Sequence, residues 1–232
     1  MNKTIKNQAN KNNNNMPEEY GVEIYSSSVT FNHSKVWLCG SIEEPSAYNN
    51  LMQELLTAQD GDVIELWINS PGGNLHTALQ IVEGIKASPA KVIAILAGEC
   101  HSGASMIALA CNDIVVLDPA IMLVHTASEG YSGKNHEMIS FSDFLPHWIN
   151  DIVQDTYEGF MTPDEIFDLT KGVDFWFNSS QIVERLEYRN AYFEAKEKEE
   201  KEMQEDATED QEIPELINIE HLVDLNLDMD SN

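Results

Sequence analysis

The stretch Val63-Ile-Glu-Leu-Trp-Ile-Asn-Ser-Pro-Gly-Gly73 decides the fold that this sequence predicts. It is an apolar run of strand length that ends in a turn, because proline presets one turn dihedral and glycine permits a positive φ. Apolar residues at helical spacing follow from Leu75 to Ile85. A buried strand that leads through a tight turn into a helix is typical of an α/β domain with a parallel sheet.

The same order of strand, turn and helix recurs along the chain. Short apolar runs predict further strands at residues 36–40, 92–96, 114–117 and 121–124. Helical spacing predicts helices over residues 48–58, 105–110, 137–157 and 163–169, and a loop of small residues is expected from Gly98 to Ala104. Since the strands are apolar, we expect a parallel sheet covered by helices on both faces. Pro146 is expected to break or kink its helix.

The ends of the chain differ in composition from its middle. Residues 1–17 are rich in Asn and Lys and lack apolar periodicity, so we expect them to be disordered. Residues 191–232 hold fifteen acidic residues and three lysines, which leaves a formal charge of −12. This tail is expected to be solvated and disordered, with a helix over residues 194–206 as an alternative. One folded domain is therefore predicted over residues 18–190.

Charge and cysteine content exclude several classes of function. The net charge of the chain is −27, which argues against nucleic acid and anionic membrane surfaces as partners, because both require clustered Lys and Arg. The sequence has no apolar run of about 18 residues, so we expect no membrane-spanning helix. Cys39, Cys100 and Cys111 have no close spacing, so we expect neither disulfides nor a metal site. We expect no cofactor and a cytoplasmic location, which is the host cytoplasm if the chain is phage-encoded.

Three predicted loops follow strand ends, where open α/β sheets place ligands. The first is Ser70-Pro-Gly-Gly73 and the third is the end of the strand at His125. The second, Gly98-Glu-Cys-His-Ser-Gly-Ala-Ser-Met106, carries Ser105 at a predicted strand-to-helix transition, with Ser102 as a competitor three residues earlier. Alone, each signal has a simpler interpretation. The Pro-Gly-Gly segment is typical of a structural turn, Ser105 of a helix N-cap, and His125 of a hydrogen-bonded core histidine.

Together, the Asn-Ser-Pro-Gly-Gly turn, the Gly-x6-Ser-Met segment and the histidine that ends an apolar strand resemble the proteolytic subunit of the Clp protease. The resemblance runs from about residue 35 to residue 188. It implies a ClpP/crotonase-like α/β fold of repeated β-β-α units, with a protruding handle helix and a glycine-containing strand at residues 130–133. The interval of 20 residues from Ser105 to His125 resembles that of compact phage-encoded relatives.

The resemblance also implies roles for particular residues. It identifies Ser105 as the nucleophile, His125 as the general base and Asp174 as the carboxylate that orients the imidazole, with Asp118 and Asp168 as rivals. The backbone N–H groups of Gly73 and Met106 are then expected to form the oxyanion hole.

The function that the resemblance implies is a serine endopeptidase that cuts unfolded or partner polypeptides inside a homo-oligomeric chamber, either a heptameric ring or a stacked double ring. An AAA+ unfoldase is an expected partner, because the sequence has no Gly-x4-Gly-Lys-Ser/Thr loop of its own. Action on phage head proteins during capsid maturation is a second possibility. Two alternatives stay open: a catalytically silent assembly or scaffolding protein, and an acyl-CoA enzyme of the crotonase fold.

Overall fold

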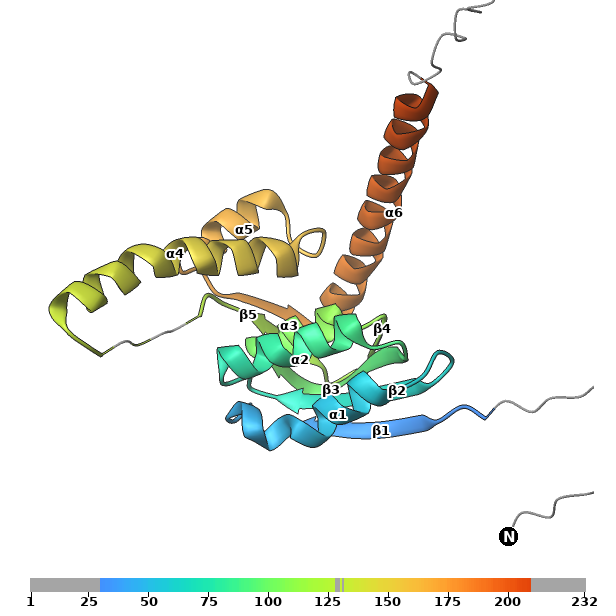
Figure 1. The fold of residues 1–232 in the computed structure, drawn as a ribbon, viewed down its shortest axis with the longest axis horizontal. Helices are drawn as coiled ribbons and strands as arrows, with labels where there is room; N and C mark the ends of the chain where they lie inside the picture. The colour runs from blue at the N-terminus through green and yellow to red at the C-terminus, as the bar shows by residue number, and fades with distance from the viewer. Residues whose placement is uncertain (1–29, 128–129, 131, 210–232) are drawn as a thin grey trace, which may run out of the picture. The chain divides into compact units, whose positions relative to one another are not determined.

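The computed structural model describes residues 30–127, 130 and 132–209, so the predictions for residues 1–17 lie outside the described residues. Strands and helices alternate through the first half of this range, as the sequence predicts, and helices dominate the second half (Figure 1). The elements are β1 (His33–Cys39), η1 (Pro45–Tyr48), α1 (Asn49–Thr57), β2 (Val63–Ser70), α2 (Leu75–Ala87), β3 (Lys91–His101), α3 (Gly103–Ala110), β4 (Asp113–Val116), β5 (Ile121–Val124), α4 (Asn135–Tyr157), α5 (Pro163–Thr170), β6 (Phe175–Asn178) and α6 (Ser179–Glu209).

Within the described residues, the strands form one six-stranded sheet in the order β1-β2-β3-β5-β6, with β4 paired to β3 beside this path. Every pairing is parallel except that of β5 with β6, which is antiparallel. The long strand β3 pairs with β4 through Ile93–Leu96 and with β5 through Glu99–His101. The mixed α/β fold with a parallel core is therefore confirmed, and it is consistent with a ClpP-like fold.

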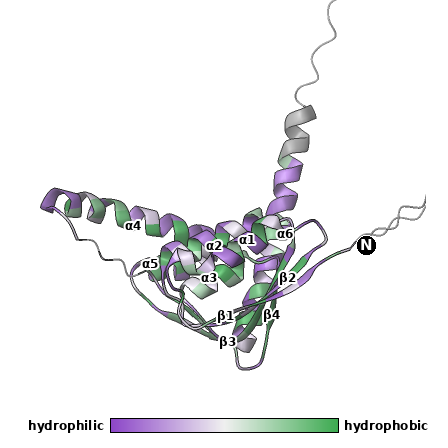
Figure 2. Ribbon diagram, turned by 60° about the horizontal axis from the view of Figure 1, so that its bottom comes forward, coloured by the Kyte–Doolittle hydropathy of each residue, from purple (hydrophilic) through white to green (hydrophobic). Residues whose placement is uncertain are grey.

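The core lies between the sheet and helices α1, α2 and α3, which pack on the same face (Figure 2). Along β2, Ile64, Leu66 and Ile68 are buried on this face, while the residues between them are partly exposed. Burial of each such side chain stabilises the fold by about 1.5–3 kcal/mol. On the opposite face, Trp37 is 64% exposed and Val115 is 44% exposed. Helices therefore do not cover this second face completely within the described residues, in contrast to the predicted cover on both faces.

Helix α4 is continuous from Asn135 to Tyr157 with Pro146 inside it. Of the predicted break or kink at Pro146, the break is wrong, although proline has no N–H to donate to the preceding turn. Only the C-terminal part of α4 is buried, at Ile149, Val153 and Tyr157. The expected strand at residues 130–133 lies partly outside the described residues, and its described positions are not in a strand.

Helix α6 runs from Ser179 to Glu209, so the predicted domain boundary near residue 190 falls inside a helix. Residues 191–209 are helical, as the alternative interpretation of the acidic tail proposed, and residues 210–232 lie outside the described residues. The helix is anchored at its start, where Ile182 is fully buried. None of the helices within the described ranges is long and apolar enough to cross a membrane.

Candidate active site

The Pro-Gly-Gly turn after β2 and the turn after β3 are in direct contact. Gly72 has a φ of +88°, and a Cβ atom placed on it would lie 2.6 Å from the carbonyl oxygen of His101 and 2.7 Å from Cβ of Ser102. Only glycine permits both this dihedral and this approach. The sequence segment that predicts the fold therefore also forms one wall of the site.

Ser102 is the single residue between β3 and α3. Its φ of 55° and ψ of −125° make it the one non-glycine residue with a positive φ among those described. The sheet holds this turn, because the amide of Ser102 donates to the carbonyl of Leu123 on β5 at 2.8 Å. Such backbone strain costs about 1–3 kcal/mol and is found most often at functional sites. The loop expected over residues 98–104 is instead a strand up to His101 and a one-residue turn.

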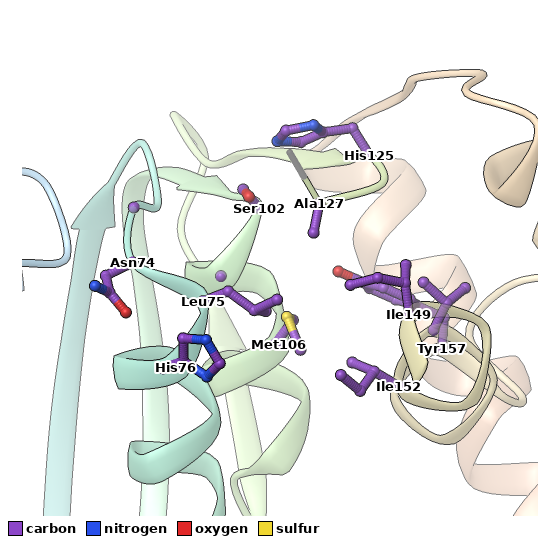
Figure 3. A pocket seen from close by; sticks show the side chains of 13 residues that line it. Asn74, Leu75, His76, Ser102, Met106, His125, Ala127, Ile149, Ile152 and Tyr157 are labelled. Atoms are coloured by element: carbon purple, nitrogen blue, oxygen red, sulfur yellow. The ribbon is translucent and has the colours of Figure 1, made fainter. Parts of the chain in front are cut away.

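Ser102 faces a pocket of about 220 Å³ at the carboxyl edge of the sheet. Figure 3 shows Ser102 and His125 near one end of this pocket and His76 near the other, with Tyr157 beside Ile149 and Ile152 on the opposite side. Apolar side chains form most of the remaining wall, and helix α4 supplies several of them. The lining residues are Gly73, Asn74, Leu75, His76, Ser102, Gly103, Met106, His125, Ala127, Ile149, Ile152, Val153 and Tyr157.

Ser105 does not line this pocket. Its side chain is 0% exposed within α3. Its hydroxyl donates to the carbonyl of Ser102 at 2.7 Å and lies 2.8 Å from the hydroxyl of Tyr157. A nucleophile has to reach substrate, so this placement does not favour the predicted role of Ser105. It favours Ser102, which the sequence offered as the competitor.

His125 lines the pocket directly after β5, as the sequence predicts. Strand β6 brings the neighbourhood of Asp174 to the same place, since the antiparallel register ends with Val124 opposite Phe175. Continued by one residue, this register pairs His125 with Asp174. Opposed residues of an antiparallel pair have Cβ atoms about 4.5–5.5 Å apart. The described residues show no hydrogen bond from His125 to Ser102 or to Asp174, and the rivals Asp118 and Asp168 lie elsewhere, after β4 and within α5.

Two glycines that line the pocket near Ser102 have backbone N–H groups without a hydrogen-bond acceptor among the described residues. Gly73 lies at its rim, and its amide has no hydrogen-bond acceptor among the described residues. Gly103 is the first residue of α3, where an N–H group has no acceptor within the helix. The amide of Met106, in contrast, is directed at the carbonyl of Ser102 at 3.4 Å. Gly73 therefore suits the predicted oxyanion hole, whereas Gly103 is better placed than Met106 to be the second donor.

Two further histidines surround the site, and the sequence analysis missed both. The buried Nε2 of His101 has no hydrogen-bond partner in the described structure, and the ring meets Trp176 edge-on at 5.2 Å. Burial lowers the pKa of His101, against an opposing effect of the Glu99 carboxylate and with a smaller lowering by nearby His125, which favours the neutral imidazole. His76 stacks on Trp148 at the pocket rim, with ring centroids 5.6 Å apart. Of the two, only His76 could have been found from the sequence, because it lies in the first turn of the helix that follows the Pro-Gly-Gly turn.

A family model described as Clp protease matches residues 18–184, which is most of the chain. The chain belongs to the Clp protease family. Membership supports a ClpP-like peptidase and agrees with the resemblance that the sequence motifs indicated.

The chain is also similar to a Clp protease subunit from Pseudomonas aeruginosa (strain PAO1), the ATP-dependent Clp protease proteolytic subunit 2. The two sequences are 26% identical over 160 residues, which cover 65% of this chain and 76% of the relative. Neither comparison assigns a role to an individual residue, so the roles within the Clp protease site rest on the geometry described above.

Proposed function

We propose that this protein is a serine endopeptidase in which Ser102 is the nucleophile, His125 the general base and Asp174 the residue that orients His125. The observation that carries the proposal is the strained one-residue turn at Ser102, which presents a serine to a pocket that His125 also lines. A strand-to-helix turn of this kind exposes a serine hydroxyl at a helix N-terminus, where the helix dipole favours developing negative charge.

Catalysis by these residues follows from their chemistry. A serine hydroxyl becomes an effective nucleophile when a base takes its proton as it attacks. Neutral His125 accepts that proton while Ser102 Oγ bonds to the scissile carbonyl carbon, and the resulting imidazolium is stabilised by Asp174. The imidazolium then protonates the leaving amine, and water hydrolyses the acyl-enzyme by the same steps with His125 again as the base.

The oxyanion of the tetrahedral intermediate is proposed to accept hydrogen bonds from the amides of Gly73 and Gly103. Both amides lie on rigid backbone at the pocket, one fixed by the Ile42–Gly73 bridge and the other by α3. Removal of one such donor typically lowers the rate by about 10²–10³-fold. A substitution at Gly73 or Gly103 keeps the backbone N–H group. Such a variant would therefore lower the rate by moving the donor, not by removing it.

The proposed substrate is an extended polypeptide whose side chain enters the apolar part of the pocket, between Met106 and helix α4. Main-chain hydrogen bonds to an exposed backbone edge hold such a segment without requiring a particular sequence. By analogy with a relative named as an ATP-dependent proteolytic subunit, we also propose a ring-shaped homo-oligomer that works with an AAA+ unfoldase. The alternative to action with an unfoldase is cleavage of phage head proteins during capsid maturation.

A fluorophosphonate probe tests the proposal, because the activated serine displaces fluoride from phosphorus and its proton passes to the base. The wild-type chain, Ser102→Ala and Ser105→Ala are each incubated with the probe, and mass spectrometry locates the adduct. We expect an adduct on Ser102, none in Ser102→Ala, and a slower reaction in Ser105→Ala. A folded wild-type protein that forms no adduct would instead indicate a catalytically silent scaffolding protein, and an adduct that persists in Ser102→Ala would exclude Ser102.

A further inference from the structure

Ser102 needs support from its surroundings to keep its conformation. A positive φ is unfavourable for a residue with a Cβ atom, and it persists only when neighbouring contacts fix the backbone. On one side, the amide of Ser102 is bound to Leu123 of the sheet. On the other side, its carbonyl accepts from the amide of Ser105 at 2.9 Å, as in an ordinary first helical turn.

The carbonyl of Ser102 has an additional donor, which a first helical turn does not supply. The Ser105 hydroxyl donates to it at 2.7 Å. A hydroxyl has one proton, so the same oxygen is left to accept from the Tyr157 hydroxyl, 2.8 Å away. Burial raises the pKa of Tyr157, which keeps the phenol protonated and therefore a donor. The result is a short chain of hydrogen bonds from Tyr157 through Ser105 to the carbonyl of Ser102.

The chain joins two elements that are distant in the sequence. Tyr157 is the last residue of α4, its side chain is 2% exposed, and its hydroxyl reaches the wall of the pocket. Ser105 is 0% exposed in α3. Both hydroxyls are buried, so loss of the Ser105 hydroxyl removes the extra donor to the Ser102 carbonyl and leaves the Tyr157 hydroxyl without its acceptor. Loss of the Tyr157 hydroxyl leaves the Ser105 hydroxyl bound to that carbonyl but no longer held from the other side, which allows the turn at Ser102 to relax.

We propose that Ser105 and Tyr157 are positioning residues that hold the Ser102 turn in the geometry that attacks substrate. This deepens the proposed function and rests on Ser102 as the nucleophile. Neither side chain touches the reacting atoms in this scheme. Ser105 acts on the Ser102 carbonyl, and Tyr157 acts through Ser105.

The test measures the rate at which a fluorophosphonate acylates Ser102 in the full chain, at saturating probe and below the thermal midpoint of each variant. The variants are Tyr157→Phe, Ser105→Ala and the double variant. Tyr192→Phe is the matched control, because it removes a tyrosine hydroxyl with a hydrogen bond of the same 2.8 Å length, made to Glu158 away from the pocket. A net hydrogen bond of about 1 kcal/mol corresponds to a rate change of about fivefold.

We expect Tyr157→Phe to acylate about fivefold more slowly and Ser105→Ala about tenfold more slowly, with the control unchanged. The double variant should equal Ser105→Ala, since Tyr157 acts only through that hydroxyl. For peptide hydrolysis, kcat should fall while KM stays constant. Acylation rates at the wild-type level in both single variants, or additive losses in the double variant, would overturn the proposal even if thermal midpoints fell.

If Ser105→Ala does not fold, Tyr157→Phe decides the matter, because it keeps the packing of the ring. Two further outcomes separate this proposal from the proposed function. If Ser102→Ala still forms the adduct, the nucleophile is elsewhere, and the positioning roles are rejected together with it. If the adduct requires Ser102 but its rate of formation is unchanged in the Ser105 and Tyr157 variants, the proposed peptidase function is retained and only the positioning roles are rejected.

Discussion

The backbone of Gly72 lies against the side chain of Ser102, with room for a hydrogen but not for a methyl group. A Cβ atom at position 72 would come within 2.7 Å of Ser102 Cβ and 2.6 Å of the His101 carbonyl oxygen. Neither neighbour is the free end of a flexible side chain, so neither can move aside cheaply. The geometry of the proposed nucleophile therefore depends on the absence of a side chain in a different loop.

Gly72→Ala is expected to lower the rate of fluorophosphonate acylation by about 100-fold, because displacement of a reacting group by about 1 Å has an effect of that size. The measurement is the single-turnover acylation rate of the folded variant. Gly172→Ala is the control, since Gly172 has a φ of +94° but open space where a Cβ would be placed. It should incur the backbone cost of about 1–2 kcal/mol for a left-handed residue and keep the wild-type acylation rate. Equal rate losses in both variants would contradict the steric argument.

Asp174→Asn is expected to lower kcat for peptide hydrolysis by about 10³–10⁴-fold, because an amide neither fixes the histidine tautomer nor stabilises the imidazolium. The register of β5 with β6 is the reason to choose this carboxylate, since it ends with Val124 opposite Phe175 and its continuation by one residue would bring Asp174 opposite His125. Asp118→Asn and Asp168→Asn are the comparisons. A large loss of kcat in either of these variants, with activity retained in Asp174→Asn, would transfer the role to the rival.

Glu165→Gln is expected to destabilise the fold by about 1–3 kcal/mol at pH 7 and to have a smaller effect at pH 3. Glu165 binds Arg185 through two hydrogen bonds of 2.6 and 2.9 Å and is also part of the N-terminal cap of α5. The Arg185 guanidinium holds the pKa of Glu165 below its ordinary value of 4.5. The stabilisation is therefore complete above about pH 4.5 and is lost as the pH falls through the lower folded pKa.

The measurement is urea unfolding of wild type and Glu165→Gln at both pH values. Glu83→Gln serves as the control, because its ion pair with Lys86 is largely exposed and contributes little. If the stability difference between wild type and Glu165→Gln were as large at pH 3 as at pH 7, the charged form of Glu165 would not be its source.

The sequence alone determined the α/β class, most element positions and the contribution of the Pro-Gly-Gly turn, because these depend on local periodicity and on residues with restricted or permissive dihedrals. It placed His125 at the pocket, since a strand end is a local feature. It could not place the boundary between β3 and α3, where Ala, Gly and Ser suit a loop, a strand end or a helix start alike. That ambiguity of a few residues is why the sequence favoured Ser105 over Ser102 as the candidate nucleophile.

Only the tertiary structure decided which serine faces the pocket. Pairing of β3 with β5 extends the strand to His101, and the Gly72 turn then leaves one residue for the change of direction, which is Ser102. The same long-range contacts bury Ser105 beneath Tyr157, 52 residues away in the chain. Exposure of a side chain depends on what packs against it from elsewhere, and local sequence does not contain that information.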